Sequence, residues 1–464
     1  MMKSGNSDGA KGTREREGMK SKPRNYTPVT VPFAATPAGE PPSVDAWAHR
    51  AVWTDCMLTA LQRGVRGGRW HTLGDKVWNP INLHAAARHV IANDGAAGVD
   101  HVTATQFENR LIPELRRIES ELQANAYRPQ QIRRTYIKKL GSQEKRPLGI
   151  PTVRDRVIQT ALLHVLEPIF DVTFHERSFG FRRGRGCHHA LERVETLLTT
   201  GHTFVVDADL KGYFDSIPHE RLLARVREKV SDSRVLGWIE QMLKQGILDG
   251  LAEWTPEEGT PQGSVISPLL ANIYLNPLDH HLSSQGFELV RYADDFVVMC
   301  RTREEAERAL EVIRVWVEEN GLTLHPTKTR IADYHSPEGF AFLGYLFKKG
   351  CIIEPRPKSA QKLKDSLRAK TKRTNGTSCE VIIQSVNATL RGWMGYFKHC
   401  HWSIFRDFDQ WLRDRIRSIL RKREKRRGRA QGTDRKSWPN EFFAKSGLVS
   451  LSRLHTELSQ SCFR

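Results

Sequence analysis

The sequence predicts an α+β fold in which helices surround a small antiparallel sheet. Three short runs are rich in the β-branched and aromatic residues typical of strands: 204–206, 289–291 and 296–299. Longer stretches repeat apolar residues at helical spacing: 45–90, 103–126, 154–170 and 303–319. Because the second and third strand candidates are separated by only a few residues, we expect them to pair as a β-hairpin.

The predicted hairpin carries two adjacent acids at its tip. Residues 292–295 are Tyr-Ala-Asp-Asp, so Asp294 and Asp295 lie between two apolar strands. Burying two neighbouring carboxylates is costly without a cation, which predicts a site for divalent metal. Nucleotidyl transfer needs such a site, because two Mg²⁺ ions about 3.5–4 Å apart can activate a 3′ hydroxyl and stabilise a pyrophosphate leaving group together.

A third acid for this site lies upstream, after the first strand candidate. Asp209 follows 204–206 and would project from the carboxyl end of that strand toward the hairpin. Asp207 shares its face by strand alternation, so strand geometry alone leaves both acids open as ligands. Between the two acidic segments lies 261–264, Pro-Gln-Gly-Ser, and this combination makes an ordinary solvated Asp-Asp turn a poor explanation.

In this order, the segments resemble reverse-transcriptase motifs, and their details resemble those of group II intron-encoded proteins. The resemblance covers about 79–347 and includes four further stretches: 93–100, 146–156, 178–185 and 342–345. It implies a right-hand polymerase with fingers, an antiparallel palm sheet and a helical thumb. The family's five-residue step from acid to aromatic, here from Asp209 to Phe214, favours Asp209 over Asp207 as the metal ligand.

The resemblance also implies roles for individual residues. Asp209 and Asp294 are the expected bridging ligands of two Mg²⁺ ions, and the Leu210 carbonyl and Asp295 complete the shell. Six residues are expected around the incoming dNTP. They are the fingers cations Lys139 and Arg146, the sugar-discriminating ring of Phe214, Gln262 and Gly263 under the base, and the palm lysine Lys328. This chain has Tyr-Ile-Lys-Lys-Leu at 136–140 where the family often has Tyr-Ile-Pro-Lys-Pro, so Lys138 stays open as an alternative to Lys139.

The charge of the chain favours a nucleic-acid partner. The formal net charge is +19 over 464 residues, and the segment 356–429 holds 21 lysines and arginines against 6 acids. Within it, 391–397 resembles the maturase-specific domain of group II intron proteins, which also serves as the polymerase thumb and is implied to bind intron RNA and assist splicing. The expected contacts with template or intron RNA are Arg182, Arg183, Arg185, Arg391, Lys398, Arg413 and Arg417.

Four regions are expected along the chain. Residues 1–44 are polar, and we expect them to form a disordered basic extension. We expect the reverse transcriptase domain at 45–350, with its core motifs at about 119–347. The thumb or maturase domain is expected at 351–429, followed by a short tail at 430–464. The 7 cysteines include no Cys-x-x-Cys pair and about 35 residues follow 429, so no endonuclease domain is expected. No apolar run reaches about 18 residues, so we expect no membrane partner and a cytoplasmic bacterial protein, associated with the nucleoid when its element moves.

Together these features predict an RNA-directed DNA polymerase encoded by a group II intron. Its expected partners are the intron RNA, an RNA template with a DNA primer, dNTPs and the target DNA of retrohoming. A splicing-only maturase stays open as an alternative, although the intact acids argue against it. A non-intron bacterial reverse transcriptase, of the retron, diversity-generating or defence type, is disfavoured by the 391–397 match. An RNA-dependent RNA polymerase is disfavoured because the Phe214 ring would clash with a ribose 2′ hydroxyl.

Overall fold

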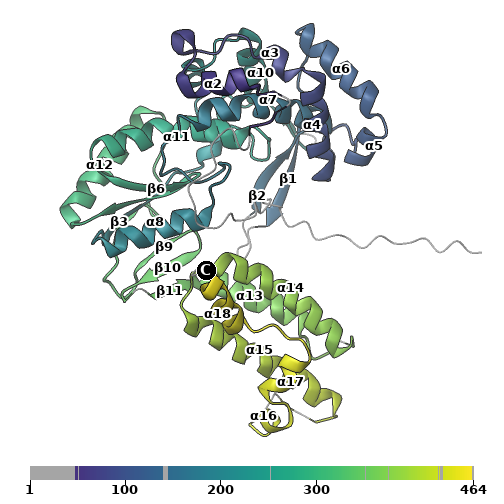
Figure 1. The fold of residues 1–464 in the computed structure, drawn as a ribbon, viewed down its shortest axis with the longest axis vertical. Coiled ribbons are helices and arrows are strands. Elements are labelled where there is room, and N and C mark those ends of the chain that lie inside the picture. Colours follow the sequence, from purple (N-terminus) through teal and green to yellow (C-terminus); the bar gives the residue numbers. More distant parts are fainter. Residues whose placement is uncertain are drawn as a thin grey trace, which may run out of the picture.

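The computed structural model describes residues 48–50, 52–138, 145–250, 252–350, 352–374, 376–426, 428 and 432–461. Helices and three separate β-sheets make up this part of the chain, which confirms the predicted α+β class. Figure 1 shows three parts: fingers at the upper right, a palm at the left and a helical thumb below. No helix among the described residues is long and apolar enough to cross a membrane.

The palm sheet has the strand order β6-β7-β3-β8. All of its pairs are antiparallel, and its strands are β6 (Glu288–Tyr292), β7 (Asp295–Cys300), β3 (Phe204–Asp209) and β8 (Arg330–Asp333). The central strands are apolar on both faces because α11 (Ser267–Ser284) and α12 (Arg303–Glu319) pack on one face and α8 (Cys187–Thr199) packs on the other. The predicted strands and hairpin are therefore confirmed.

The fingers sheet has the strand order β2-β1-β4-β5. β1 (Ile132–Lys138) pairs antiparallel with β2 (Lys145–Ile150) and parallel with β4 (Ile247–Asp249), and β4 pairs antiparallel with β5 (Ala252–Trp254). Apart from α8, α11 and α12, the helices that precede the third sheet are α2 (Asp55–Arg63), α3 (Gly74–Val77), α4 (Pro80–Ala92), α5 (Ala104–Glu108), α6 (Leu111–Gln123), α7 (Val153–Asp171), α9 (His219–Arg227) and α10 (Ser233–Leu243). The short 3₁₀ turns are η1 (Arg66–Gly68) and η2 (Tyr213–Asp215). Most of α7 is buried and none of its residues is exposed, so this helix lies inside the large core that it shares with α11 and α12.

Three of the four predicted helical stretches are confirmed: α5 and α6 lie within 103–126, and α7 and α12 match 154–170 and 303–319. The fourth, 45–90, is not one continuous helical region. Gly64, Gly67 and Gly68 all have positive φ, which lets the chain turn sharply between α2 and α3. The apolar spacing indicated buried faces correctly but did not show this break.

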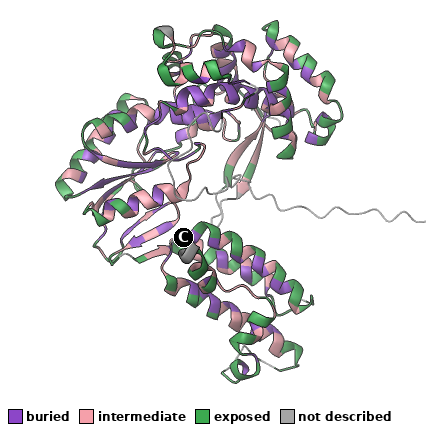
Figure 2. Ribbon diagram, viewed as in Figure 1, coloured by how far each residue is buried: buried purple, intermediate pink, exposed green. Residues whose placement is uncertain are grey.

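A third sheet connects the palm to the thumb. It consists of β9 (Phe340–Phe342), β10 (Tyr345–Lys348) and β11 (Ile352–Pro355) in the order β11-β10-β9. The thumb follows as α13 (Pro357–Lys370), α14 (Cys379–Phe397) and α15 (Trp402–Arg423). Each of these helices buries one stripe and exposes the other, as Figure 2 shows.

The residues predicted as a short tail belong to the thumb instead. They form α16 (Asp434–Ser437), α17 (Asn440–Lys445) and α18 (Leu451–Ser461). Trp438, Phe443 and Leu451 are buried in the same core as α14 and α15. Asp409 of α15 accepts a hydrogen bond from the Leu451 amide at 2.8 Å, which satisfies one of the free amides at the start of α18. The predicted boundary at 429 is therefore wrong, and residues 1–44 lie outside the described residues.

Candidate active site

The catalytic turn joins β6 to β7 at the edge of the palm sheet. Tyr292 pairs with Asp295 across the hairpin, and Ala293 adopts a φ of 61°, an unusual value for a residue with a side chain. Asp295 is also the direct cross-strand partner of Asp209 at the end of β3. The structure thus brings the two acidic segments together, as strand order and hairpin pairing require.

The carboxylates repel one another at this edge. Burial raises the pKa of Asp294, and the charge of Asp209 raises it further. Loss of hydration raises the pKa of Asp295 to about 7, although part of its side chain meets solvent, and Asp207, Asp294 and Asp209 add to this shift. A neighbouring cation would relieve the repulsion, and carboxylate oxygens are the ligands that Mg²⁺ and Ca²⁺ prefer.

Lys328 provides one such cation in the structure. Its Nζ lies 2.7 Å from Asp209 Oδ2, and both side chains reach solvent. The segment before it runs beside the end of β3, because the His325 amide donates to the Asp209 carbonyl at 2.7 Å and the Lys211 amide donates to the Thr323 carbonyl at 2.8 Å. Neither bond uses the carbonyl of Leu210, the predicted backbone ligand.

The acidic edge offers the carboxylate oxygens that a divalent metal prefers, but these oxygens are not yet arranged around one point as a complete set of ligands. Within the described ranges, no group of three or more His, Cys, Asp or Glu side chains is arranged to hold a metal ion as it stands. Asp207, the alternative ligand, faces Arg330 instead, with 3.8 Å between Asp207 Oδ2 and Arg330 Nε. Burial raises its pKa, and the charge of Arg330 lowers it.

One of the two predicted fingers cations can be located. Arg146 lies on β2, and its positive charge lowers the pKa of Asp294, so it faces the acidic edge closely enough to act on it. Lys139 lies outside the described residues. Lys138 ends β1 and pairs with Lys145 of β2, so the choice between Lys138 and Lys139 stays a prediction.

The loop that holds Gln262 and Gly263 connects the palm to the fingers. The Gly149 amide of β2 donates to the Gln262 carbonyl at 2.6 Å, and Gln262 Nε2 donates to Asp215 Oδ2 at 3.0 Å. Gly263 has a φ of 112°, and a Cβ added there would lie 2.2 Å from the Gly149 carbonyl oxygen. Only glycine allows this approach, so the loop is held against the strand that carries Arg146.

Phe214 lies in η2, five residues after Asp209. Its ring is half-buried and makes an edge contact with Tyr213 at 5.5 Å between ring centroids. Its carbonyl accepts from the Thr260 amide at 2.6 Å, which fixes it beside the loop of Gln262. Phe214 therefore packs against the core while keeping part of its surface accessible, next to the loop that holds Gln262.

Replacement of Phe214 by Ala should weaken the preference for dNTPs over rNTPs by roughly 10- to 100-fold, because a steric barrier to the 2′ hydroxyl is removed. The measurement is the ratio of kcat/KM for dCTP and CTP on one RNA template, which is independent of the active fraction of enzyme. Phe214→Tyr keeps the ring and should keep the preference. An unchanged ratio in Phe214→Ala would contradict the assignment.

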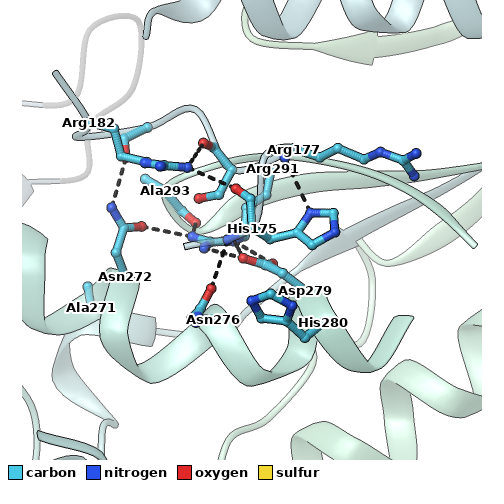
Figure 3. Close-up of polar contacts among 12 residues, drawn as sticks. His175, Arg177, Arg182, Ala271, Asn272, Asn276, Asp279, His280, Arg291 and Ala293 are labelled. Carbon is cyan, nitrogen blue, oxygen red and sulfur yellow. Dashed lines mark hydrogen bonds and ion pairs between the residues drawn. The ribbon is translucent and has the colours of Figure 1, made fainter. Parts of the chain in front are cut away.

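The predictions did not include a buried cation just before the catalytic turn. Arg291 of β6 is fully buried and donates from Nε to Asp279 Oδ1 at 2.7 Å. Its Nη1 donates to the Ala293 carbonyl at 2.9 Å, inside the turn itself (Figure 3). The signal available in the sequence was a polar pattern within apolar α11, at Asn272, Asn276 and Asp279.

The three arginines predicted to contact template lie on the loop before α8. Arg182 is buried and donates to Asp171 Oδ1 at 2.7 Å and to the His175 and Ser178 carbonyls, so its role is internal and we withdraw it as a phosphate contact. Arg183 donates to Glu167 at 2.9 Å and is half-buried. Loss of hydration lowers the pKa of Arg185 to about 10, and its guanidinium lies over the Phe179 ring at 5.8 Å.

The four thumb residues predicted to contact RNA also differ in how far their side chains are exposed. Arg391 is exposed on α14, and Lys398 and Arg413 are half-buried. Arg417 is buried: it donates to the Trp438 carbonyl at 2.9 Å and to Asn440 at 3.0 Å, and it lies over the Phe443 ring. These bonds attach α17 to α15, so Arg417 is also withdrawn as a phosphate contact.

Comparison with protein families identifies both halves of the chain. Residues 137–347 match the model "Reverse transcriptase (RNA-dependent DNA polymerase)". Residues 360–438 match the model "Group II intron, maturase-specific domain". The first match contains all of the acids at the palm edge, and the second begins within α13 and includes α14, α15 and α16 of the thumb.

Protein YkfC of Escherichia coli is 36% identical over 310 residues, which cover 58% of this chain and 81% of YkfC. The group II intron-encoded protein LtrA of Lactococcus lactis is 39% identical over 202 residues, which cover 43% of this chain and 33% of LtrA. The chain thus spans most of YkfC but about one third of LtrA.

Among solved structures, a partial Cas6-RT-Cas1–Cas2 complex has a TM-score of 0.36 at 25% identity, with 54% of this chain and 42% of that chain covered. Telomerase from Candida albicans has a TM-score of 0.41 at 12% identity, with 73% of this chain and 67% of that chain covered.

The two domain models in their order, together with the similarity to YkfC and LtrA, identify the family: the chain belongs to the group II intron-encoded reverse transcriptases, which carry a maturase-specific domain.

Proposed function

We propose that this protein is a Mg²⁺-dependent RNA-directed DNA polymerase that copies group II intron RNA and also assists its splicing. The observation that carries the proposal is the convergence of Asp209, Asp294 and Asp295 at one sheet edge, opposite Arg146 of the fingers. Nucleotidyl transfer requires acidic side chains that bind the metal ions and basic side chains that bind the triphosphate. The palm edge supplies the acids and the fingers supply the cations.

Mg²⁺ would be held by the carboxylates of Asp209, Asp294 and Asp295 and by the Leu210 carbonyl, all of which are hard oxygen donors. When bound there, it would activate the primer 3′ hydroxyl and neutralise charge on the triphosphate. The pKa values of Asp294 and Asp295, which burial and then the neighbouring carboxylates raise, support this assignment because a bound cation would offset the crowded negative charge.

The side chains around the edge would bind and orient the nucleotide. Arg146 offers a planar fork for phosphate oxygens, while Lys328, whose side chain is 62% exposed, can exchange its bond with Asp209 for a bond with phosphate. From that position its ammonium group could donate a proton to the leaving pyrophosphate. Phe214 would lie against the sugar and exclude a 2′ hydroxyl.

The fingers sheet offers a surface for the single-stranded template. Strand register places Arg134, Tyr136 and Trp254 on one face, and the Arg134 guanidinium lies 5.0 Å from the Trp254 ring and 6.0 Å from the Tyr136 ring. Both rings are exposed. Aromatic rings and guanidinium planes bind single strands by stacking on bases without regard to sequence. Burial raises the pKa of Asp215, and both the charge of Arg134 and the hydrogen bond from Gln262 oppose that rise, which links this face to the loop of Gln262.

The thumb supports the second half of the proposal. Its match to a maturase-specific domain and its exposed basic residues, such as Arg391, favour binding to intron RNA through the phosphate backbone. The target DNA of retrohoming is proposed as a further partner on the strength of family membership alone.

The deciding experiment is primer extension on an RNA template with a DNA primer, dNTPs and Mg²⁺, run in parallel with rNTPs and with excess EDTA. We expect full-length cDNA with dNTPs, little product with rNTPs and none with EDTA. A folded protein that binds RNA but makes no cDNA would instead be a splicing-only maturase. Equal products from rNTPs and dNTPs would indicate an RNA-dependent RNA polymerase.

A further inference from the structure

The helix α11 carries a row of polar side chains in an otherwise apolar setting. Asn272, Asn276 and Asp279 lie four and three residues apart, so they share one face of the helix. Asn272 and Asp279 are buried, and Asn276 is half-buried. Buried polar groups need partners, and this face supplies them to two separate segments: the loop before α8 and the hairpin that holds the catalytic turn.

Arg291 receives most of these partners. Its Nε lies 2.7 Å from Asp279 Oδ1, and its Nη2 lies 2.5 Å from Asp279 Oδ2, a two-point ion pair with no exposed surface on either side chain. Its Nη1 donates to Asn272 Oδ1 at 2.8 Å and to the Ala293 carbonyl at 2.9 Å. Figure 3 shows the guanidinium between α11 and the turn.

Asn272 connects this group to the loop before α8. Its Nδ2 donates to the Gly180 carbonyl at 2.8 Å, while its Oδ1 accepts from Arg291. Gly180 itself presses on the turn, because a Cβ added there would lie 2.2 Å from the Ala293 nitrogen. The Phe179 amide donates to the Arg291 carbonyl at 2.8 Å, so the loop also pairs with β6.

These contacts enclose Ala293 from two sides. Its carbonyl is held by Arg291, and its amide side lies against Gly180, while its φ of 61° is a strained conformation for a residue with a side chain and needs support from its surroundings. Asp294 is the next residue in the chain. A shift of the Ala293 peptide would therefore move the Asp294 carboxylate directly.

We propose that Asn272, Asp279 and Arg291 are positioning residues that hold the catalytic turn, and with it Asp294, in the geometry needed for metal binding and catalysis. The proposal rests on the function proposed above for Asp294. A buried ion pair is weak evidence for stability alone, because a well-packed apolar pair is often as stable. The fixed direction of the guanidinium fork toward Ala293 is what an apolar pair could not supply.

The test compares Asn272→Ala with Asn276→Ala, a matched control one helical turn away. Asn276 also bonds the loop backbone, by accepting from the His175 amide at 3.0 Å and donating to the Thr173 carbonyl at 3.1 Å, but it forms no hydrogen bond with Arg291 or Gly180. We expect kcat for cDNA synthesis to fall about 10- to 100-fold in Asn272→Ala, the scale on which small misplacements of catalytic groups act. The KM for template-primer should change little, and Asn276→Ala should keep kcat within about threefold of wild type.

A second measurement keeps the test separate from the proposed activity. The rise in Tm that Mn²⁺ or Mg²⁺ produces reports metal binding without turnover. The metal concentration for half of this rise should increase about tenfold in Asn272→Ala and stay unchanged in Asn276→Ala. If wild type makes no cDNA but Asn272→Ala weakens metal binding, the polymerase proposal fails and the positioning proposal stands.

Several outcomes would overturn the positioning proposal. Equal losses of kcat and metal affinity in the two variants would mean that the polar row acts only on stability. Wild-type kcat and metal affinity in Asn272→Ala would show that the turn holds its shape without this contact. If Asn272→Ala does not fold, Asn272→Ser leaves a smaller cavity and is judged by the same two measurements. Arg291→Lys keeps the charge opposite Asp279 but cannot reach three partners, so a kcat near wild type in that variant would also contradict the proposal.

Discussion

Replacement of Asp294 by Asn is expected to reduce cDNA synthesis on the order of 10³-fold or more without unfolding the protein. The substitution keeps the shape of the side chain and removes one negative oxygen from the proposed metal site. Metal ions contribute several kcal/mol to transition-state stabilisation, and each 1.36 kcal/mol is a tenfold change in rate. The loss should appear in kcat at saturating dNTP and template-primer.

The same substitution should leave the stability of the protein unchanged or raise it. The pKa of Asp294 is raised by burial and by the charge of Asp209. A carboxyl group whose pKa is higher in the folded protein than in the unfolded chain lowers the stability as the pH rises from the unfolded to the folded pKa. Above the folded pKa, the group is charged in both states and the loss of stability is complete. Asn carries no charge at any pH, so Tm measured without metal at pH 8 should not fall.

Asp207→Asn is the matched control for this experiment. Asp207 lies on the same strand and face as Asp209 and also has a pKa raised by burial, but it faces Arg330. We expect it to retain at least about a third of the wild-type rate, and both variants to bind intron RNA as wild type does. A large loss in Asp207→Asn with activity retained in Asp209→Asn would reverse the choice between these two acids.

The residues at the acidic edge could be predicted because their signals are local. Asp294 and Asp295 lie between two apolar runs of strand length, and a hairpin with five paired residues on each strand leaves little choice of geometry. Asp209 required one further step, the pairing of β3 with β7, which the order of the motifs supplied. Long periodic helices such as α7 and α12 were equally accessible.

What the sequence did not reveal depends on contacts between distant segments. Arg182 and Arg417 were predicted to bind nucleic acid because charge is visible in a sequence, whereas the buried partners Asp171 and Trp438 are not. The helices α16 and α17 are too short to show a helical period, and the spacing of Leu451, Leu454 and Leu458 in α18 indicates a helix but not that it packs against the thumb core. Gly180 and Gly263 were in recognised segments, but which backbone each one touches appears only in the fold.

Replacement of Gly263 by Ala is expected to lower kcat/KM for dNTPs on the order of 10²-fold and to destabilise the protein by about 1–3 kcal/mol. The added methyl group would meet the Gly149 carbonyl oxygen at 2.2 Å, and the φ of 112° is disfavoured for any residue with a side chain. Neither strain can be relieved without separating the loop from β2. Since Arg146 lies on that strand and Gln262 lies in that loop, the separation should raise the KM for dNTP more than it lowers kcat.

Gly201→Ala separates these two effects. Gly201 lies in the turn before β3 with a φ of 88°, and an added Cβ would have no atom within 4 Å, so its substitution carries backbone strain without a collision. It should lose roughly 1 kcal/mol of stability and keep its kcat/KM. If Gly263→Ala behaved in the same way, the close approach of loop and strand would have no part in nucleotide binding. If it loses affinity for dNTP at equal stability, then the distance between the palm loop and the fingers strand sets the geometry in which the base and the triphosphate are held together.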